Sequence, residues 1–317
     1  MNGLFMSIAF TSKLKIEAVV NGLPTVPADS KFRLLYHNAQ NSNWNPNLDI
    51  DWIEDIGYGS VISNTNHAAL SEFAKFQKKD TKTLFSQFQW ELQFWLVCQF
   101  LYGEQAALVG TSALAMILAD NDQKLVCSTQ IADEARHVLT FSRYVDRYIK
   151  KPYGMSAPLK NLLSDALNAF SWDMKVLGMQ IIVEGLAEAT FRLGAAMFHD
   201  PVIRRIVELV SIDESRHVTF GVLLLRKYYQ NISSSEKRIR EEFVLDCAEA
   251  IQKRFLLTDI WERLDIPQKR GIDFAKQSSV MIDFRRTVFS KIGLVLRNLD
   301  LMSDNMRMKL QKMQLLR

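Results

Sequence analysis

The sequence predicts an all-α fold. Long stretches repeat apolar residues at the three- and four-residue spacing of an amphipathic helix. Helix breakers are scarce, with 13 glycines and 7 prolines in 317 residues, and no segment keeps the alternation typical of a strand. Because 48% of the residues are hydrophobic and 23% are charged, we expect a globular chain with a large buried core.

The first 65 residues are the least regular part of the chain. They hold Pro24, Pro27 and Pro46, so we expect residues 1–65 to form an arm that covers a helical body. The rest is predicted to be helical over approximately 66–79, 82–119, 122–150, 157–169, 172–199, 201–231 and 234–263, with shorter helices to the end.

The breaks between these helices have local signals. Asp120 is placed to cap the helix that follows it, and Asp200 precedes Pro201, a proline at the first helical position. Ser233 and Glu236 have the spacing of a capping box. We therefore predict an arm, a helical bundle and a C-terminal helical extension over 1–65, 66–231 and 232–317.

Two short segments carry nearly the same residues. They are Asp133-Glu134-Ala135-Arg136-His137-Val138 and Asp213-Glu214-Ser215-Arg216-His217-Val218. Each contains Glu-x-x-His, which places a carboxylate and an imidazole on one helix face. A single copy would be weak evidence, since the bland alternative is a surface pair on a long helix. Two copies with shared flanking residues indicate a common site.

The spacing of two further glutamates repeats as well. Glu104 precedes the first motif by 134 − 104 = 30 residues, and Glu184 precedes the second by 214 − 184 = 30. The midpoints fall beside the predicted breaks, so each segment folds as a helical hairpin with its ends at one level. Two such hairpins would form a four-helix bundle with six groups inside: Glu104, Glu134, His137, Glu184, Glu214 and His217.

The charge of this set predicts a dinuclear metal site. Four ionised carboxylates in a bundle core would repel one another, and two divalent cations would neutralise them. One glutamate from each of two helices and Glu-x-x-His from the other two is the ligand pattern of diiron and dimanganese bundles. Carboxylate and imidazole ligands favour iron or manganese, so we expect two Fe ions, with Mn/Fe as the alternative, and O₂ as co-substrate.

At these residues the sequence resembles the ferritin-like diiron-carboxylate superfamily. The resemblance covers about residues 82–231 and implies a ferritin-like four-helix bundle. Known activities of the superfamily include multicomponent monooxygenases, ribonucleotide reductase small subunits, acyl-carrier-protein desaturases and arylamine N-oxygenases. The segment that begins at Gly103 is similar to the first-ligand helix of the monooxygenase hydroxylases. By this likeness Glu134 and Glu214 would bridge the metals, and Glu104 and Glu184 would be terminal.

The resemblance also implies supporting roles for the residues that flank the ligands. Asp133 would hydrogen-bond the ring of His217, and Asp213 would hydrogen-bond that of His137. Arg136 and Arg216 would pair with these aspartates; the alternative is that they are ordinary surface arginines.

The sequence departs from individual families at three positions. Phe141 stands where radical-forming ribonucleotide reductase subunits usually have tyrosine. Val210 stands where arylamine N-oxygenases carry an extra histidine. Glu188 stands where aromatic monooxygenases have threonine. Glu188 would be either a further ligand or proton relay on the face of Glu184, or the partner of Arg192 in a salt bridge.

Apolar neighbours of the ligands are candidates for a substrate pocket, although such residues also fill ordinary cores. If they line a cavity, the substrate is apolar or aromatic. They are Phe100, Leu101, Leu108, Phe141, Ile181 and Phe191.

We therefore expect an enzyme that activates O₂ to oxidise a small apolar, aromatic or amine substrate by hydroxylation, N-oxygenation or desaturation. No flavin, nicotinamide or iron–sulfur motif is present, which implies an external electron donor, a ferredoxin or a reductase. The alternatives are a non-enzymatic iron-binding ferritin relative and a radical-generating subunit. A homodimer is expected.

Composition excludes other classes of function. The net charge is +4 with scattered Lys and Arg, which predicts no nucleic-acid partner. Gln93, Gln99 and Glu104 interrupt the most apolar stretch, so no membrane span is expected. Three cysteines lie far apart and the N-terminus lacks a convincing signal sequence, which together predict a cytoplasmic protein.

Overall fold

The computed structural model describes residues 30–60, 62, 67–76 and 81–317. Within these residues every regular element is helical, and none is a strand. The predicted all-α, ferritin-like fold class is therefore confirmed. Among the described helices, none combines the length and the apolar character needed to cross a bilayer.

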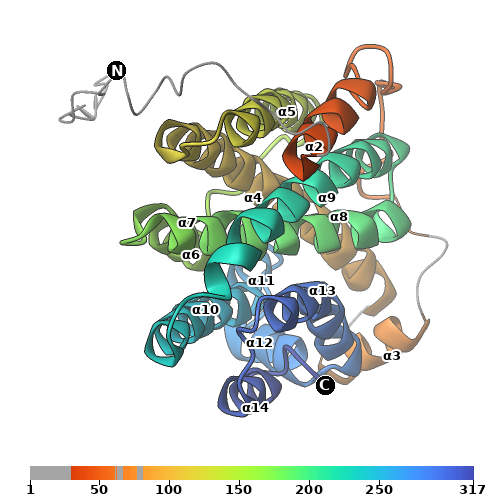
Figure 1. Cartoon of the computed structure of the whole chain (residues 1–317). Coiled ribbons are helices and arrows are strands. Elements are labelled where there is room, and N and C mark those ends of the chain that lie inside the picture. Colours follow the sequence, from red (N-terminus) through yellow and green to blue (C-terminus); the bar gives the residue numbers. More distant parts are fainter. Residues whose placement is uncertain (1–29, 61, 63–66, 77–80) are drawn as a thin grey trace, which may run out of the picture.

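Two helical hairpins form the central bundle (Figure 1). Helix α4 (Thr81–Ile117) pairs with α5 (Asn121–Tyr148), and α8 (Glu184–Met197) pairs with α9 (Pro201–Tyr229). Both turns use the predicted capping aspartates: Asp120 accepts a hydrogen bond from the Gln123 amide, and Asp200 accepts one from the Ile203 amide. Because α5 also packs on α9, the two hairpins bring their middles together.

The segment that we expected to form one regular α-helix over 172–199 contains a π-helical turn. It consists of α7 (Trp172–Val176), the π-helix η1 (Leu177–Val183) and then α8. Close packing surrounds the π-helical turn, since a Cβ atom on Gly178 would lie 2.8 Å from the Cβ of Ala166. A π-helical turn shifts the faces that the following residues present, and the next residue is Glu184.

The arm contains a helix that the sequence interpretation did not predict. Helix α2 (Lys31–Asn41) begins at Ser30, whose side chain accepts a hydrogen bond from the Arg33 amide. It packs on α5 and α9, and its Phe32 contacts the apolar core. Residues 1–29 lie outside the described residues. Helix α3 (His67–Phe76) packs against α4 and two C-terminal helices.

Six further helices surround the bundle. In Figure 1, α2 lies on one side of the bundle and the C-terminal helices lie on the other. The single helix expected over 234–263 is wrong, because the chain turns after Arg254 and Leu257 has a φ of 56°. The six are α6 (Ala157–Asn168), α10 (Ser234–Arg254), α11 (Thr258–Arg263), α12 (Gln268–Gln277), α13 (Ser279–Asn298) and α14 (Asp304–Lys312).

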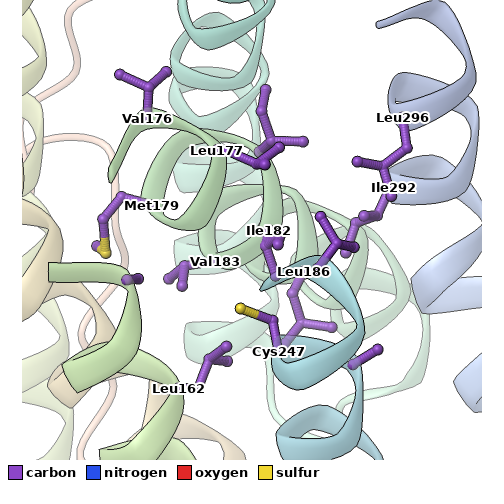
Figure 2. Close-up of a cluster of buried hydrophobic side chains, with 14 of the residues drawn as sticks. Leu162, Val176, Leu177, Met179, Ile182, Val183, Leu186, Cys247, Ile292 and Leu296 are labelled. Atoms are coloured by element: carbon purple, nitrogen blue, oxygen red, sulfur yellow. The ribbon is translucent and has the colours of Figure 1, made fainter. Parts of the chain in front are cut away.

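An apolar cluster packs η1 and α8 against α10 and α13. Figure 2 shows Ile182 and Leu186 packed among Cys247 of α10 and Ile292 and Leu296 of α13. All five are almost completely buried. Because each large apolar side chain contributes roughly 1.5–3 kcal/mol on full burial, this cluster secures the segment that ends at Glu184.

Candidate metal centre

The six predicted ligands meet inside the bundle. Glu104 comes from α4, while α8 begins at Glu184. The two Glu-x-x-His motifs lie on α5 and α9, and all six side chains are buried. The residues form two groups, and within each group one ligand atom per residue lies within 4.8 Å of the others: Glu104, Glu134, His137 and Glu214; and Glu134, Glu184, Glu214 and His217.

Both imidazoles direct Nδ1 toward carboxylates. His137 Nδ1 lies 3.2 Å from Glu104 Oε2 and 3.4 Å from Glu214 Oε1. His217 Nδ1 lies 3.2 Å from Glu134 Oε1 and 3.2 Å from Glu214 Oε2. Glu134 and Glu214 therefore belong to both groups, in the manner of two carboxylates placed between two cations.

The two shared glutamates have buried oxygens that no protein group satisfies. Glu134 Oε2 and Glu214 Oε1 accept no hydrogen bond from any described residue. Leaving a buried carboxylate oxygen without a donor is unfavourable by a few kcal/mol. A metal ion would satisfy each oxygen, and two divalent ions would neutralise the four glutamates. The donor set thus fits a pair of iron or manganese ions.

The pKa shifts at the centre show that cations stabilise this group of carboxylates. Burial raises the pKa of Glu104, and the Glu214 carboxylate adds to the effect. Burial likewise raises the pKa of Glu184, with Glu134 contributing. Burial by itself would lower the pKa of His137, but its contacts with Asp213 and Glu104 outweigh burial and raise it. The carboxylates therefore favour a proton or another cation among them.

An aspartate lies behind each histidine. His137 Nε2 lies 3.0 Å from Asp213 Oδ2, and His217 Nε2 lies 3.3 Å from Asp133 Oδ2. These are the pairs that the resemblance implies. Because Nε2 faces a carboxylate, it carries the hydrogen whenever Nδ1 binds a metal, which fixes both the tautomer and the ring orientation.

Two arginines join the aspartates into a closed ring. Arg136 Nη2 donates to Asp133 at 2.5 Å and to Asp213 at 2.9 Å. Arg216 Nη2 donates to Asp213 at 2.5 Å and to Asp133 at 3.1 Å. Neither arginine is an ordinary surface residue, since each bridges the two halves of the bundle.

Comparison with known proteins identifies the family of this chain. The sequence profile of the p-aminobenzoate N-oxygenase AurF family matches residues 113–300, which is more than half of the 317 residues. The chain belongs to the AurF family. The matched span includes five of the six clustered residues, and Glu104 lies just before it. No curated protein matches the chain significantly by sequence.

Solved structures of R2-like ligand-binding oxidases share the fold. A variant with an anaerobically reconstituted Mn/Fe cofactor has a TM-score of 0.60 at 19% identity, with 88% of this chain and 96% of that chain covered. A form with an aerobically reconstituted metal cofactor after photoconversion has a TM-score of 0.58 at 21% identity, with the same coverage. A variant with an aerobically reconstituted Fe/Fe cofactor has a TM-score of 0.58 at 22% identity, with 86% and 95% covered.

Membership of the AurF family confirms the predicted class of function. The chain is an O₂-dependent diiron oxidoreductase of the oxygenase and oxidase type. Its cofactor is a dinuclear iron centre, and its co-substrate is O₂.

The arm contributes to the centre of this AurF-family protein in a way that the sequence interpretation missed. Trp44 Nε1 donates to Asp213 Oδ2 at 2.7 Å, and the indole stacks on His137 with ring centroids 6.1 Å apart. Arg136 also lies over Trp44, 4.8 Å from the ring centroid. Sequence spacing gives no signal for Trp44, because it lies 169 residues from Asp213.

Gln130 is a second residue that was missed. Its Nε2 donates to Glu134 Oε1 at 3.1 Å and to Gln180 Oε1 at 3.1 Å, and it lies 3.4 Å from Glu184 Oε1. A signal was present in the sequence, since Gln130 lies one helical turn before Glu134 on the inward face. Gln130 therefore connects ligands from the two hairpins.

Glu188 follows the salt-bridge alternative. Its buried carboxylate lies 2.9 Å from Arg192 Nη2 and also contacts Lys291 Nζ of α13. Among the described residues, neither group of potential metal ligands includes Glu188. Two nearby cations balance its charge, which favours the salt-bridge alternative over the further ligand or relay.

The predicted pocket is only partly present. Phe100, Phe141 and Phe191 form an aromatic cluster, with centroids of Phe100 and Phe191 4.6 Å apart. A cavity of about 30 Å³ adjoins Glu104 and Glu184, and Phe100 and Phe191 line it. The other four predicted pocket residues do not line this cavity: Leu101, Leu108, Phe141 and Ile181.

Proposed function

We propose that the six clustered residues bind two iron ions, with Glu134 and Glu214 contacting both. The observation that carries this proposal is the pair of four-residue groups that share these two glutamates. The buried, unsatisfied oxygens of the same two glutamates support it independently. The full ligand set is Glu104, Glu134, His137, Glu184, Glu214 and His217.

Bound iron would supply the electron-transfer chemistry that activates O₂. The chain's own residues hold that chemistry in place. Asp213 and Asp133 orient the two imidazoles, and Arg136 and Arg216 fix the aspartates. Gln130 holds Glu134 against the second hairpin. Burial of the centre excludes bulk water from the reaction.

We propose an aromatic amine as the substrate and its nitrogen as the oxidised atom. The name of the family, a p-aminobenzoate N-oxygenase, supports this class, and the aromatic cluster beside the centre suits an aromatic ring. One atom of O₂ would enter an N–H bond, and the other would leave as water. This balance takes two electrons and two protons, so an external donor, a ferredoxin or a reductase, belongs to the proposal.

The second candidate cofactor, the location and the oligomeric state complete the proposal. Mn/Fe is the second candidate cofactor, since structurally similar oxidases hold either Mn/Fe or Fe/Fe. A cytoplasmic location suits three cysteines that are all free and buried. A homodimer is retained from the sequence interpretation.

Oxidation of 4-aminobenzoate by the iron-loaded, chemically reduced protein tests the substrate class. Under ¹⁸O₂ we expect a hydroxylamine product that carries ¹⁸O, detected by mass spectrometry. His217→Ala, checked for its helical content, should give none. Iron-loaded protein that consumes O₂ and oxidises no aromatic amine would contradict the substrate and leave the metal site standing.

A further inference from the structure

Among the residues that the structure describes, Arg254 is a buried cation without a polar partner. The residue is 6% exposed, and its Nε has no acceptor. Within the described residues its guanidinium makes no hydrogen bond or ion pair, and it lies over the Trp95 ring, 5.2 Å from the centroid. Burial lowers the pKa of Arg254 to about 10, so the side chain is still charged at neutral pH.

Other buried arginines of the chain differ from Arg254. Arg240 donates through Nε to Asp173 at 3.0 Å. Arg285 donates to the Ala275 carbonyl oxygen and to Gln314 Oε1. A buried charge that lacks a counter-charge is strongly unfavourable. A bound anion would therefore stabilise the Arg254 guanidinium.

The surroundings of Arg254 indicate where such an anion would lie. Arg254 lines the cavity of about 30 Å³ that also touches Glu104 and Glu184. Apart from these charged ends, the walls are mainly apolar, with Phe100 and Phe191 among them. A ligand with its anionic end at Arg254 would direct its other end toward the candidate metal centre.

We propose that Arg254 binds the carboxylate of an aryl carboxylate substrate and so directs the amino group toward Glu104 and Glu184. This inference rests on the proposed function, from which it takes the aromatic amine, and it adds the residue that recognises the acid. A cavity of about 30 Å³ accommodates a carboxylate group, whereas the ring requires its apolar wall to move. The carboxylate of a fatty acid has the same head-group chemistry, so the test must separate the two sources.

Binding of benzoate, benzamide and octanoate to the full chain tests the proposal. Calorimetric titrations use the iron-loaded protein, kept anaerobic, and the metal-free protein. Benzamide has the shape of benzoate without its charge. In both forms we expect benzoate to bind about 10- to 100-fold tighter than benzamide, the range for a hydrogen-bonded buried charge. Octanoate should bind more weakly than benzoate.

Two variants locate this preference. Arg254→Met should abolish the preference for benzoate and, because it removes an unpaired buried charge, should fold at least as stably as wild type. Arg285→Met, at a buried arginine that has partners, should keep the preference. The wild-type comparison needs no variant, so a poorly folded Arg254→Met would not prevent the test.

Three outcomes would overturn the proposal. Equal affinities of the wild type for benzoate and benzamide would show that no cation of the site binds the carboxylate. Retention of the preference in Arg254→Met would place the recognition elsewhere. An octanoate affinity above that of benzoate, lost in Arg254→Met, would assign the site to an aliphatic acid. None of these results depends on iron content or turnover, so they are distinguishable from failure of the proposed function.

Discussion

The two sides of the candidate metal centre are built differently. On the side that faces the arm, the aspartates, the arginines and Trp44 form a network in which the charges of Asp133, Asp213, Arg136 and Arg216 are matched. On the side that faces α6 and α10, Glu104 and Glu184 adjoin a cavity and the unpaired Arg254. One side fixes the histidines, and the other presents a small cavity and a buried cation beside Glu104 and Glu184. Asp213→Asn and Gly221→Ala test the two sides, and variants of Glu188 and His199 provide the contrast at residues outside both.

Asp213→Asn should weaken iron binding most among these variants. The change removes the charge that faces His137, Arg136 and Arg216 while keeping the shape of the side chain. We expect iron affinity to fall about 10- to 100-fold, measured by competition with a chelator. Glu208→Gln, at a half-exposed residue paired with Arg205, should leave the affinity unchanged. Equal affinities for Asp213→Asn and wild type would show that the network on the arm side does not support the metals.

Gly221→Ala should destabilise the cavity side. The added Cβ would lie 2.6 Å from the Cβ of Gln180 in η1, so we expect the free energy of unfolding to fall by about 1–3 kcal/mol. Urea denaturation of the metal-free protein measures this change. Gly103→Ala is the matched helical control, because its Cβ would meet no atom within 4 Å; it should be neutral or stabilise by about 0.5–1 kcal/mol. If both variants are as stable as wild type, η1 yields easily and is not a fixed support.

Glu188→Gln should change stability and not the metal site. The variant loses the charge that Arg192 and Lys291 share. We expect a loss of about 1 kcal/mol, since both cations are partly exposed and can be hydrated. Glu249→Gln, in an exposed pair with Lys253, should lose less. A lower iron content or slower O₂ consumption in Glu188→Gln would return Glu188 to the reactive site.

His199→Phe should alter the pH dependence of stability, with little effect on stability above about pH 6.5. Burial, helped by the charge of Arg204, lowers the pKa of His199 to about 4. The unfolded chain therefore binds this proton more readily, so wild-type stability falls as pH drops from about 6.5 toward 4. Phenylalanine can keep the ring contact with Trp90 and removes the titration. Parallel stability curves of the two proteins over this range would contradict the assigned shift.

The features that the sequence predicted are those with local or repeated signals. Asp120 and Asp200 cap the helices that they were expected to cap, so both hairpins were found. The repeated motifs brought together the glutamates and histidines that the structure clusters. Helix α2 was missed although Ser30 is a recognisable N-cap residue, because the prolines of the arm weighed more.

The remaining features depend on contacts that no local pattern encodes. The π-helical turn is closely packed: Gly178 within it lies against Ala166 of α6, and Gly221 of α9 lies against Gln180. Arg254 looks in sequence like any basic residue at the end of a helix, and only tertiary packing buries it. Of the six predicted pocket residues, Phe100 and Phe191 line the cavity. Helical spacing says which face is apolar and not where the atoms leave space.

Iron content per chain, measured on protein loaded anaerobically with Fe²⁺, shows whether the six clustered residues form a dinuclear centre. We expect two iron ions in wild type. We expect none retained in Glu134→Ala, which removes a carboxylate shared by both groups, and two in the control Glu208→Gln. Well-folded wild-type protein that binds no iron, or Glu134→Ala that still holds two ions, would contradict the assignment of this cluster as a dinuclear centre.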